Sequence, residues 1–147
     1  MISLNLEDMV WEKYQGLCPY CGVEKNCMCI TQDKRPMHWF QNPNGTRPTS
    51  LDGFQEMFNG IYGKLNRLLP HIAVWLHLQE EIGETSRAFR LLERQGLQML
   101  RNELADVFAW LMAFCNRLQV KLSVLTYDVY PDICDTCRKP RCECPKV

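Results

Sequence analysis

Apolar residues recur every three or four positions through the middle of the chain, which is the period of an α-helix and predicts helices with one buried face. The first such stripe follows Thr49 or Ser50, and either side chain can cap the start of a helix. The stripe runs through four apolar side chains: Phe54, Met57, Ile61 and Leu65. Pro70 interrupts the pattern, and it can also occupy the first turn of the next helix.

Two longer helices are expected next, because the same period continues on both sides of Gly96. We expect one helix from about residue 71 to 94 and another from about 97 to 118, with Gly96 ending the first. Their apolar stripes are Trp75, Leu78, Ile82, Phe89 and Leu92 in the first and Leu100, Val107, Leu111, Phe114 and Leu118 in the second. A short helix over residues 123–130 ends before Pro131. Since no alternating strand pattern interrupts these stripes, the sequence predicts an all-α helical bundle.

Composition divides the chain into three segments. Polar turn formers fill residues 41–48. We therefore predict an N-terminal helix, cysteine cluster and linker over residues 1–46, a helical core over 47–130 and a C-terminal cysteine cluster over 131–147. The end segments form an internal repeat, because Tyr-Gln-Gly-Leu-Cys-Pro-Tyr-Cys at 14–21 matches Tyr-Pro-Asp-Ile-Cys-Asp-Thr-Cys at 130–137. Each copy is predicted to be a short helix that leads into a cysteine knuckle.

Eight of the nine cysteines lie in these two knuckles. The N-terminal knuckle contains Cys18, Cys21, Cys27 and Cys29, and the C-terminal knuckle contains Cys134, Cys137, Cys142 and Cys144. Four thiolates so close in sequence, two of them in a C-x2-C pair, favour structural tetrahedral Zn2+. Each knuckle can hold its own ion, or pairs from the two ends can share sites. Disulfides and an iron–sulfur cluster are the alternatives. The ninth cysteine, Cys115, is expected to be a small buried hydrophobe.

The charge balance argues against two classes of partner. Seventeen basic and 17 acidic residues give a net charge of zero, so no global field attracts nucleic acid or an anionic membrane. The apolar clusters are too short to span a bilayer, and the first residues lack the pattern of a signal peptide. We therefore expect a cytoplasmic protein with no membrane partner. We expect no nucleic-acid partner either, despite the basic residues of the C-terminal knuckle.

Two acidic motifs carry the candidate chemistry. Glu81 and Glu84 lie three residues apart in one predicted helix, and Glu103 and Asp106 have the same spacing in the next. Each pair therefore shares a helical face, at the margin of an apolar stripe. Converging carboxylates are costly to bury unless a cation holds them ionised, and oxygen ligands of this kind suit Mg2+ and phosphate-bearing substrates. The alternative is that they are helix-favouring residues on a solvated surface.

The four acidic residues in order, E-x-x-E followed by E-x-x-D, resemble the signature of the MazG-like nucleotide pyrophosphohydrolases. Flanking phrases are also similar to that family: Ile61-Tyr62-Gly63 with Asn66, His77-Leu78, and Asn116-Arg117-Leu118. The likeness covers about residues 50–130. It implies a helical bundle in which Glu81, Glu84, Glu103 and Asp106 bind Mg2+ (or Mn2+). It also implies cleavage of a (d)NTP to the monophosphate and pyrophosphate, as in clearing non-canonical or excess nucleotides, by a homodimer or dimer-based tetramer.

Further roles follow from position. Glu80 or Glu81 is the candidate general base that orients the attacking water. Lys64 and Arg87 are candidate phosphate contacts, although ordinary surface cations have the same pattern. Trp110 lies two turns from Glu103 and can stack on a base, although core packing is favoured for it and for Trp75.

The knuckles lie outside the likeness and support a second hypothesis. It describes a non-catalytic zinc-binding interaction module on a pyrophosphohydrolase-like bundle. Because all four acidic positions are filled, the enzyme is the favoured interpretation.

Overall fold

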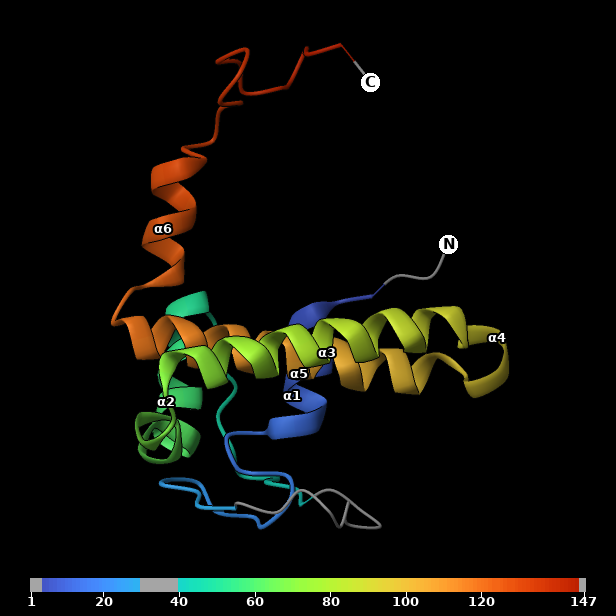
Figure 1. Cartoon of the computed structure of the whole chain (residues 1–147), viewed down its shortest axis with the longest axis vertical. Coiled ribbons are helices and arrows are strands. Elements are labelled where there is room, and N and C mark those ends of the chain that lie inside the picture. The colour runs from blue at the N-terminus through green and yellow to red at the C-terminus, as the bar shows by residue number, and fades with distance from the viewer. Residues whose placement is uncertain (1–3, 30–39, 146–147) are drawn as a thin grey trace.

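The computed structural model describes residues 4–29 and 40–145, and the described part is built of helices without strands. Helices α3 (His71–Arg90) and α5 (Leu97–Leu118) form a long hairpin and lie side by side (Figure 1). The short helix α4 (Leu92–Gln95) lies in the connection between them. Gly96, with φ 77°, then begins the return, a conformation that costs glycine little. The predicted all-α bundle is confirmed.

Helix α5 is central, because it contacts α3 on one side and both α1 (Leu6–Tyr14) and α2 (Leu51–Leu68) as well. The side chains of α1, α2 and α5 meet in one core: Val10, Tyr14, Phe54, Phe58, Ala105, Ala109 and Met112. The Tyr14 and Phe58 rings pack edge to face with centroids 4.9 Å apart. Full burial of Phe58 stabilises the fold by about 1.5–3 kcal/mol. This core fixes α1 against α5, which matters for the site described below.

The helix starts follow from local chemistry. Ser50 caps α2, its hydroxyl accepting a hydrogen bond from the backbone N–H of Gly53 at 3.1 Å. Asn5 caps α1 in the same way through the N–H of Asp8. Pro70 precedes α3, where its missing N–H costs nothing. The predicted bounds of α5 agree with the structure, and the last predicted helix corresponds to α6 (Leu122–Val129).

The structure corrects two predictions about these helices. The helix predicted over residues 71–94 breaks at Leu91, where the chain begins its turn toward α5. The predicted apolar stripe of α3 faces the core only in part, because Leu78 is buried but Trp75 is 41% and Phe89 67% exposed. Val74 and Ala88 complete the buried face. The exposed apolar residues of α3, here called the outward stripe, lie beside this buried face: Ile72, Trp75, Leu76, Ile82 and Phe89.

Helix α6 leaves the helical body as an arm that carries the C-terminal knuckle (Figure 1). Its base is tied to α2 through Gln55, whose side chain accepts the N–H of Leu122 and donates to the carbonyl of Val120. None of its own residues is buried. The N-terminal knuckle lies beside α2 at the other end of the molecule. In the described residues, no helix is long and apolar enough to cross a membrane.

Candidate active site

Three of the four predicted acidic residues converge between α3 and α5. One carboxylate oxygen from each of Glu81, Glu84 and Glu103 lies within 4.8 Å of the others. Glu81 and Glu84 face this point because they are one turn apart on α3, and Glu103 approaches from α5. Glu103 is only 4% exposed, so it lies within the buried face of α5 rather than at its margin as predicted. The solvated-surface interpretation of these residues is therefore wrong for Glu103.

The electrostatics of this cluster favour a cation. Burial, together with the nearby Asp106, Glu84 and Glu103 carboxylates, raises the pKa of Glu81 to about 8, while the Lys13 ammonium acts in the opposite direction. Ligand oxygens around one Mg2+ lie roughly 3–4 Å apart, because each is about 2.0–2.1 Å from the ion. The upper limit of 4.8 Å on the distances between the three oxygens is compatible with that range. The donor set therefore fits a hard divalent cation.

The fourth predicted ligand, Asp106, lies one turn from Glu103 but is held by α1. Its carboxylate accepts hydrogen bonds from the Lys13 ammonium and from the Tyr14 hydroxyl, the latter at 2.5 Å. Lys13 is 4% exposed and Asp106 13%, so this ion pair is largely shielded from water. Burial and the Asp106 carboxylate raise the pKa of Tyr14 well above its ordinary range, which keeps the hydroxyl protonated as a donor. Asp106 thus borders the cluster without joining it.

A hollow that is partly open to solvent adjoins these carboxylates. Acidic, aromatic and cysteine side chains share its wall. The lining residues are Tyr14, Cys18, Tyr20, Cys29, Tyr62, Leu65, Asn66, Glu81, Asp106, Ala109, Trp110 and Ala113. They come from α1, the N-terminal knuckle, α2, α3 and α5. A carboxylate group beside ring faces is suited to a ligand that has both a charged and a flat part.

The other predicted site residues are placed differently. Trp110 lines the hollow and stacks on His77, with ring centroids 4.5 Å apart and an interplanar angle of 19°. Glu80 is exposed on α3 and forms a 3.4 Å ion pair with His77. Lys64 and Arg87 are exposed and are not among the residues that line the hollow. The structure therefore brings Glu81 and Trp110 to the site but not the other three.

Sequence reasoning missed the contribution of α1. Lys13 and Tyr14 fall on the same helical face as Met9 and Val10, which are both buried. A lysine at a core position of an amphipathic helix is a usable signal, because burying it requires a partner. Tyr62 belongs to the Ile61-Tyr62-Gly63 segment that resembles the family, yet its position in the wall of the hollow follows only from the fold.

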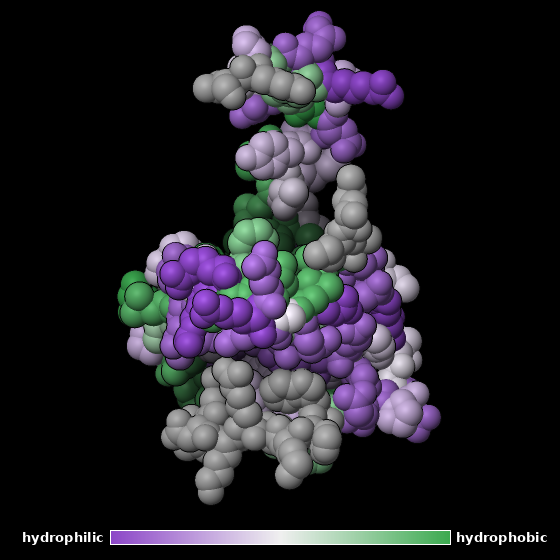
Figure 2. Space-filling model, turned by 90° about the vertical axis from the view of Figure 1, so that its right-hand side faces the viewer, coloured by the Kyte–Doolittle hydropathy of each residue, from purple (hydrophilic) through white to green (hydrophobic). Residues whose placement is uncertain are grey.

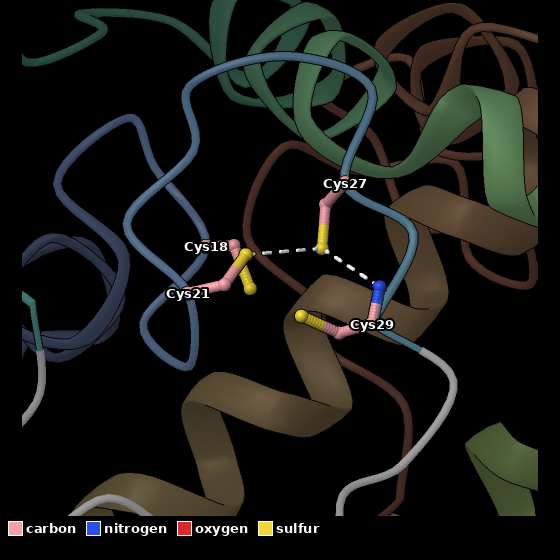
Figure 3. Close-up of side chains that lie close together, drawn as sticks. All are labelled: Cys18, Cys21, Cys27 and Cys29. Carbon is pink, nitrogen blue, oxygen red and sulfur yellow. Dashed lines mark hydrogen bonds between the residues drawn. The ribbon is translucent and has the colours of Figure 1, made fainter.

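The N-terminal knuckle gathers its four sulfurs at one point (Figure 3), each within 4.8 Å of the others. All four cysteines are free, and Cys21 Sγ lies 3.7 Å from Cys27 Sγ. The backbone N–H of Cys29 donates to Cys27 Sγ at 3.4 Å, a contact that supports a thiolate. Zinc–sulfur bonds of about 2.3 Å place the sulfurs of a tetrahedral site about 3.8 Å apart. The geometry therefore fits one zinc ion.

The C-terminal knuckle repeats this geometry on its own four cysteines. Cys134 Sγ and Cys144 Sγ are 3.8 Å apart, and the Cys144 N–H donates to Cys142 Sγ at 3.4 Å. The turn is the same in both copies. The N–H of Cys134 donates to the carbonyl of Lys139, and the N–H of Cys18 donates to the carbonyl of Val23, five residues later in each case. Each knuckle thus has a complete set of four ligands, and shared sites are not required. The predicted internal repeat is confirmed.

Comparison with known proteins gives one family. The model of the MazG nucleotide pyrophosphohydrolase domain matches residues 69–143, just over half of the chain. The matched span contains all four acidic residues and Trp110. Compared with the likeness over about residues 50–130, the match omits α2 and continues farther toward the C-terminus, into the C-terminal knuckle. No curated protein and no solved structure matches the chain.

Proposed function

The chain belongs to the MazG nucleotide pyrophosphohydrolase family, and on that premise we propose that it hydrolyses a (d)NTP to the monophosphate and pyrophosphate. The observation that carries the proposal is the convergence of Glu81, Glu84 and Glu103 beside a hollow with aromatic walls. Carboxylates that hold a divalent cation attract a triphosphate, and ring faces accept a base. The substrates expected are canonical, non-canonical or excess nucleotides.

In this proposal Glu81, Glu84 and Glu103 hold Mg2+ or Mn2+, with Asp106 as a fourth ligand or as support. The ion, when bound, neutralises charge on the phosphates and on the leaving pyrophosphate. Trp110 offers a ring to the base, and its stack on His77 fixes the orientation of the indole. Lys64 and Arg87 are assigned no contact with the substrate, because both are exposed away from the hollow's lining.

We assign the water-orienting role to Glu81 rather than Glu80, because only Glu81 lines the hollow. Glu80→Gln is expected to keep kcat within about fivefold of wild type, since an exposed ion pair such as Glu80–His77 contributes under about 1 kcal/mol. Glu81→Gln is expected to lower kcat by roughly a hundredfold or more. Steady-state pyrophosphate release at saturating Mg2+ measures both. A larger loss in Glu80→Gln than in Glu81→Gln would reverse the assignment.

The test of the activity is a pyrophosphate-release screen over canonical and damaged nucleoside triphosphates, with Mg2+ or Mn2+. Release that depends on the cation supports the enzyme. Silence across the whole panel refutes it and favours the non-catalytic zinc-binding interaction module. The exposed C-terminal knuckle is the surface such a module would use.

We also propose that each knuckle binds one structural Zn2+. The support is the sulfur spacing and the N–H to Sγ hydrogen bonds, which recur in both copies. Segments this short gain their folding free energy from the metal. The zinc content of purified protein is measured with the knuckle variants described below.

Self-association is expected from the outward stripe of α3. Ile72, Leu76 and Phe89 are each more than half exposed in the single chain, and Val124 and Val129 are half or more exposed on α6. Figure 2 shows hydrophobic surface where the α6 arm rises from the body. We expect a homodimer or dimer-based tetramer in sedimentation. Leu76→Glu with Phe89→Glu should shift it to smaller species, because it places charge in an apolar interface. A monomeric wild type would contradict this.

A further inference from the structure

We propose that the N-terminal knuckle, once it holds zinc, is a wall of the nucleotide pocket and determines how tightly the substrate binds. The inference rests on the proposed function and assigns a part of the same site to a segment outside the family match, which begins at residue 69. Three knuckle residues, Cys18, Tyr20 and Cys29, line the hollow together with Glu81 and Asp106. The knuckle therefore faces the carboxylates across one shared space.

The knuckle is held in this place by α2. The backbone N–H groups of Asn26 and Cys27 donate to the carbonyls of Gly60 and Ile61 at 3.0 and 2.7 Å. Cys18, Cys27 and Ile61 form a buried cluster, against which Tyr20 and Tyr62 pack. The position of Tyr20 in the wall thus depends on the path of the knuckle backbone between its cysteines.

The metal maintains that path. A loop of this length has no helix or strand of its own and gains its order from its ligands. Without the ion, the four thiol groups would be held only by the backbone hydrogen bonds to α2 and by the packing of Cys18 and Cys27 on Ile61. Loss of zinc should therefore let Tyr20 move away and open the wall.

The chemistry of the wall identifies which part of the substrate it meets. The triphosphate with its divalent cation goes to Glu81 and its neighbours, since these are the charged lining groups. The rings of Tyr20, Tyr62 and Trp110 remain for the base and sugar. Aromatic rings stack on any base. The knuckle is therefore expected to affect binding of the nucleoside part more than the chemical step.

The C-terminal knuckle provides a matched control. It has the same sulfur spacing and the same turn, yet none of its residues is among those that line the hollow. Cys29 and Cys144 are equivalent, because the N–H of each donates to the sulfur two residues earlier. Cys29→Ser and Cys144→Ser thus make the same chemical change at two places, only one of which borders the pocket.

The experiment measures zinc per chain by elemental analysis and KM and kcat for pyrophosphate release, on the full chain at saturating Mg2+. Both serine variants are expected to lose about one zinc. Only Cys29→Ser should raise KM, about tenfold or more, with a smaller change in kcat. A third variant, Tyr20→Leu, should keep both zinc ions and still raise KM, which separates the wall from the folding of the knuckle.

If the wild type is active, the inference alone is overturned when Cys29→Ser loses zinc without a rise in KM, or when KM is unchanged in Tyr20→Leu. If Cys29→Ser fails to fold, Tyr20→Leu decides. An equal rise of KM in Cys144→Ser would also overturn it, because it would show a general effect of zinc loss. A wild type that is silent on the whole nucleotide panel refutes the proposed function itself.

Discussion

Glu103→Gln is expected to lower pyrophosphate release on the order of a thousandfold or more and to leave the helical fold intact. Glu103 is the most buried carboxylate of the cluster and the one that α5 contributes. An amide of the same shape keeps the packing but removes one charge from a site that must hold a divalent cation. Losing several kcal/mol of stabilisation of the developing phosphate charge corresponds to this loss of rate.

The control is Glu93→Gln on α4, the same chemical change at an exposed position outside the cluster. It should release pyrophosphate at the wild-type rate. Circular dichroism of Glu103→Gln should match wild type, because the substituted side chain fills the same volume. If folded Glu103→Gln keeps more than a tenth of the wild-type rate, Glu103 is not a ligand of the catalytic cation.

The features that sequence predicted well are those determined locally. The bounds of α5 follow from its apolar period and from Gly96, and the start of α2 follows from the Ser50 cap. Each knuckle closes over a short stretch of chain, so the cysteine spacing alone was sufficient to predict that its four cysteines gather. The acidic pairs were found because carboxylates one helical turn apart must share a face.

The features that sequence missed depend on distant contacts. Lys13 and Asp106 are 93 residues apart, and no periodic pattern connects them. The helical period also shows that a stripe is apolar without showing what covers it. Phe89 was assigned to the core of the chain, whereas the structure leaves it 67% exposed, and Trp75 is 41% exposed although its ring packs on Phe114. Likewise, the place of the N-terminal knuckle beside the acidic site depends on how its backbone bonds to α2.

The buried contact between α1 and the site leads to the second large prediction. Lys13→Met is expected to lower the free energy of unfolding by about 3 kcal/mol, because it removes one partner of a shielded ion pair and leaves Asp106 near Glu81. In a chain of this size that change corresponds to a fall in Tm of roughly 6–12 °C. Thermal unfolding without added Mg2+ measures it, since a bound cation would partly replace the lost ammonium.

Asp106→Asn in the Lys13→Met background tests whether the uncompensated charge is the cause. The double variant should regain most of the lost stability, because the neutral amide no longer needs a cation and can still accept the Tyr14 hydroxyl. Asp106→Asn alone removes the carboxylate that pairs with the Lys13 ammonium and should be destabilised as well. If the double variant is as unstable as the sum of the two single variants, the two side chains act independently. The ion pair would then not be what holds α1 against the acidic site.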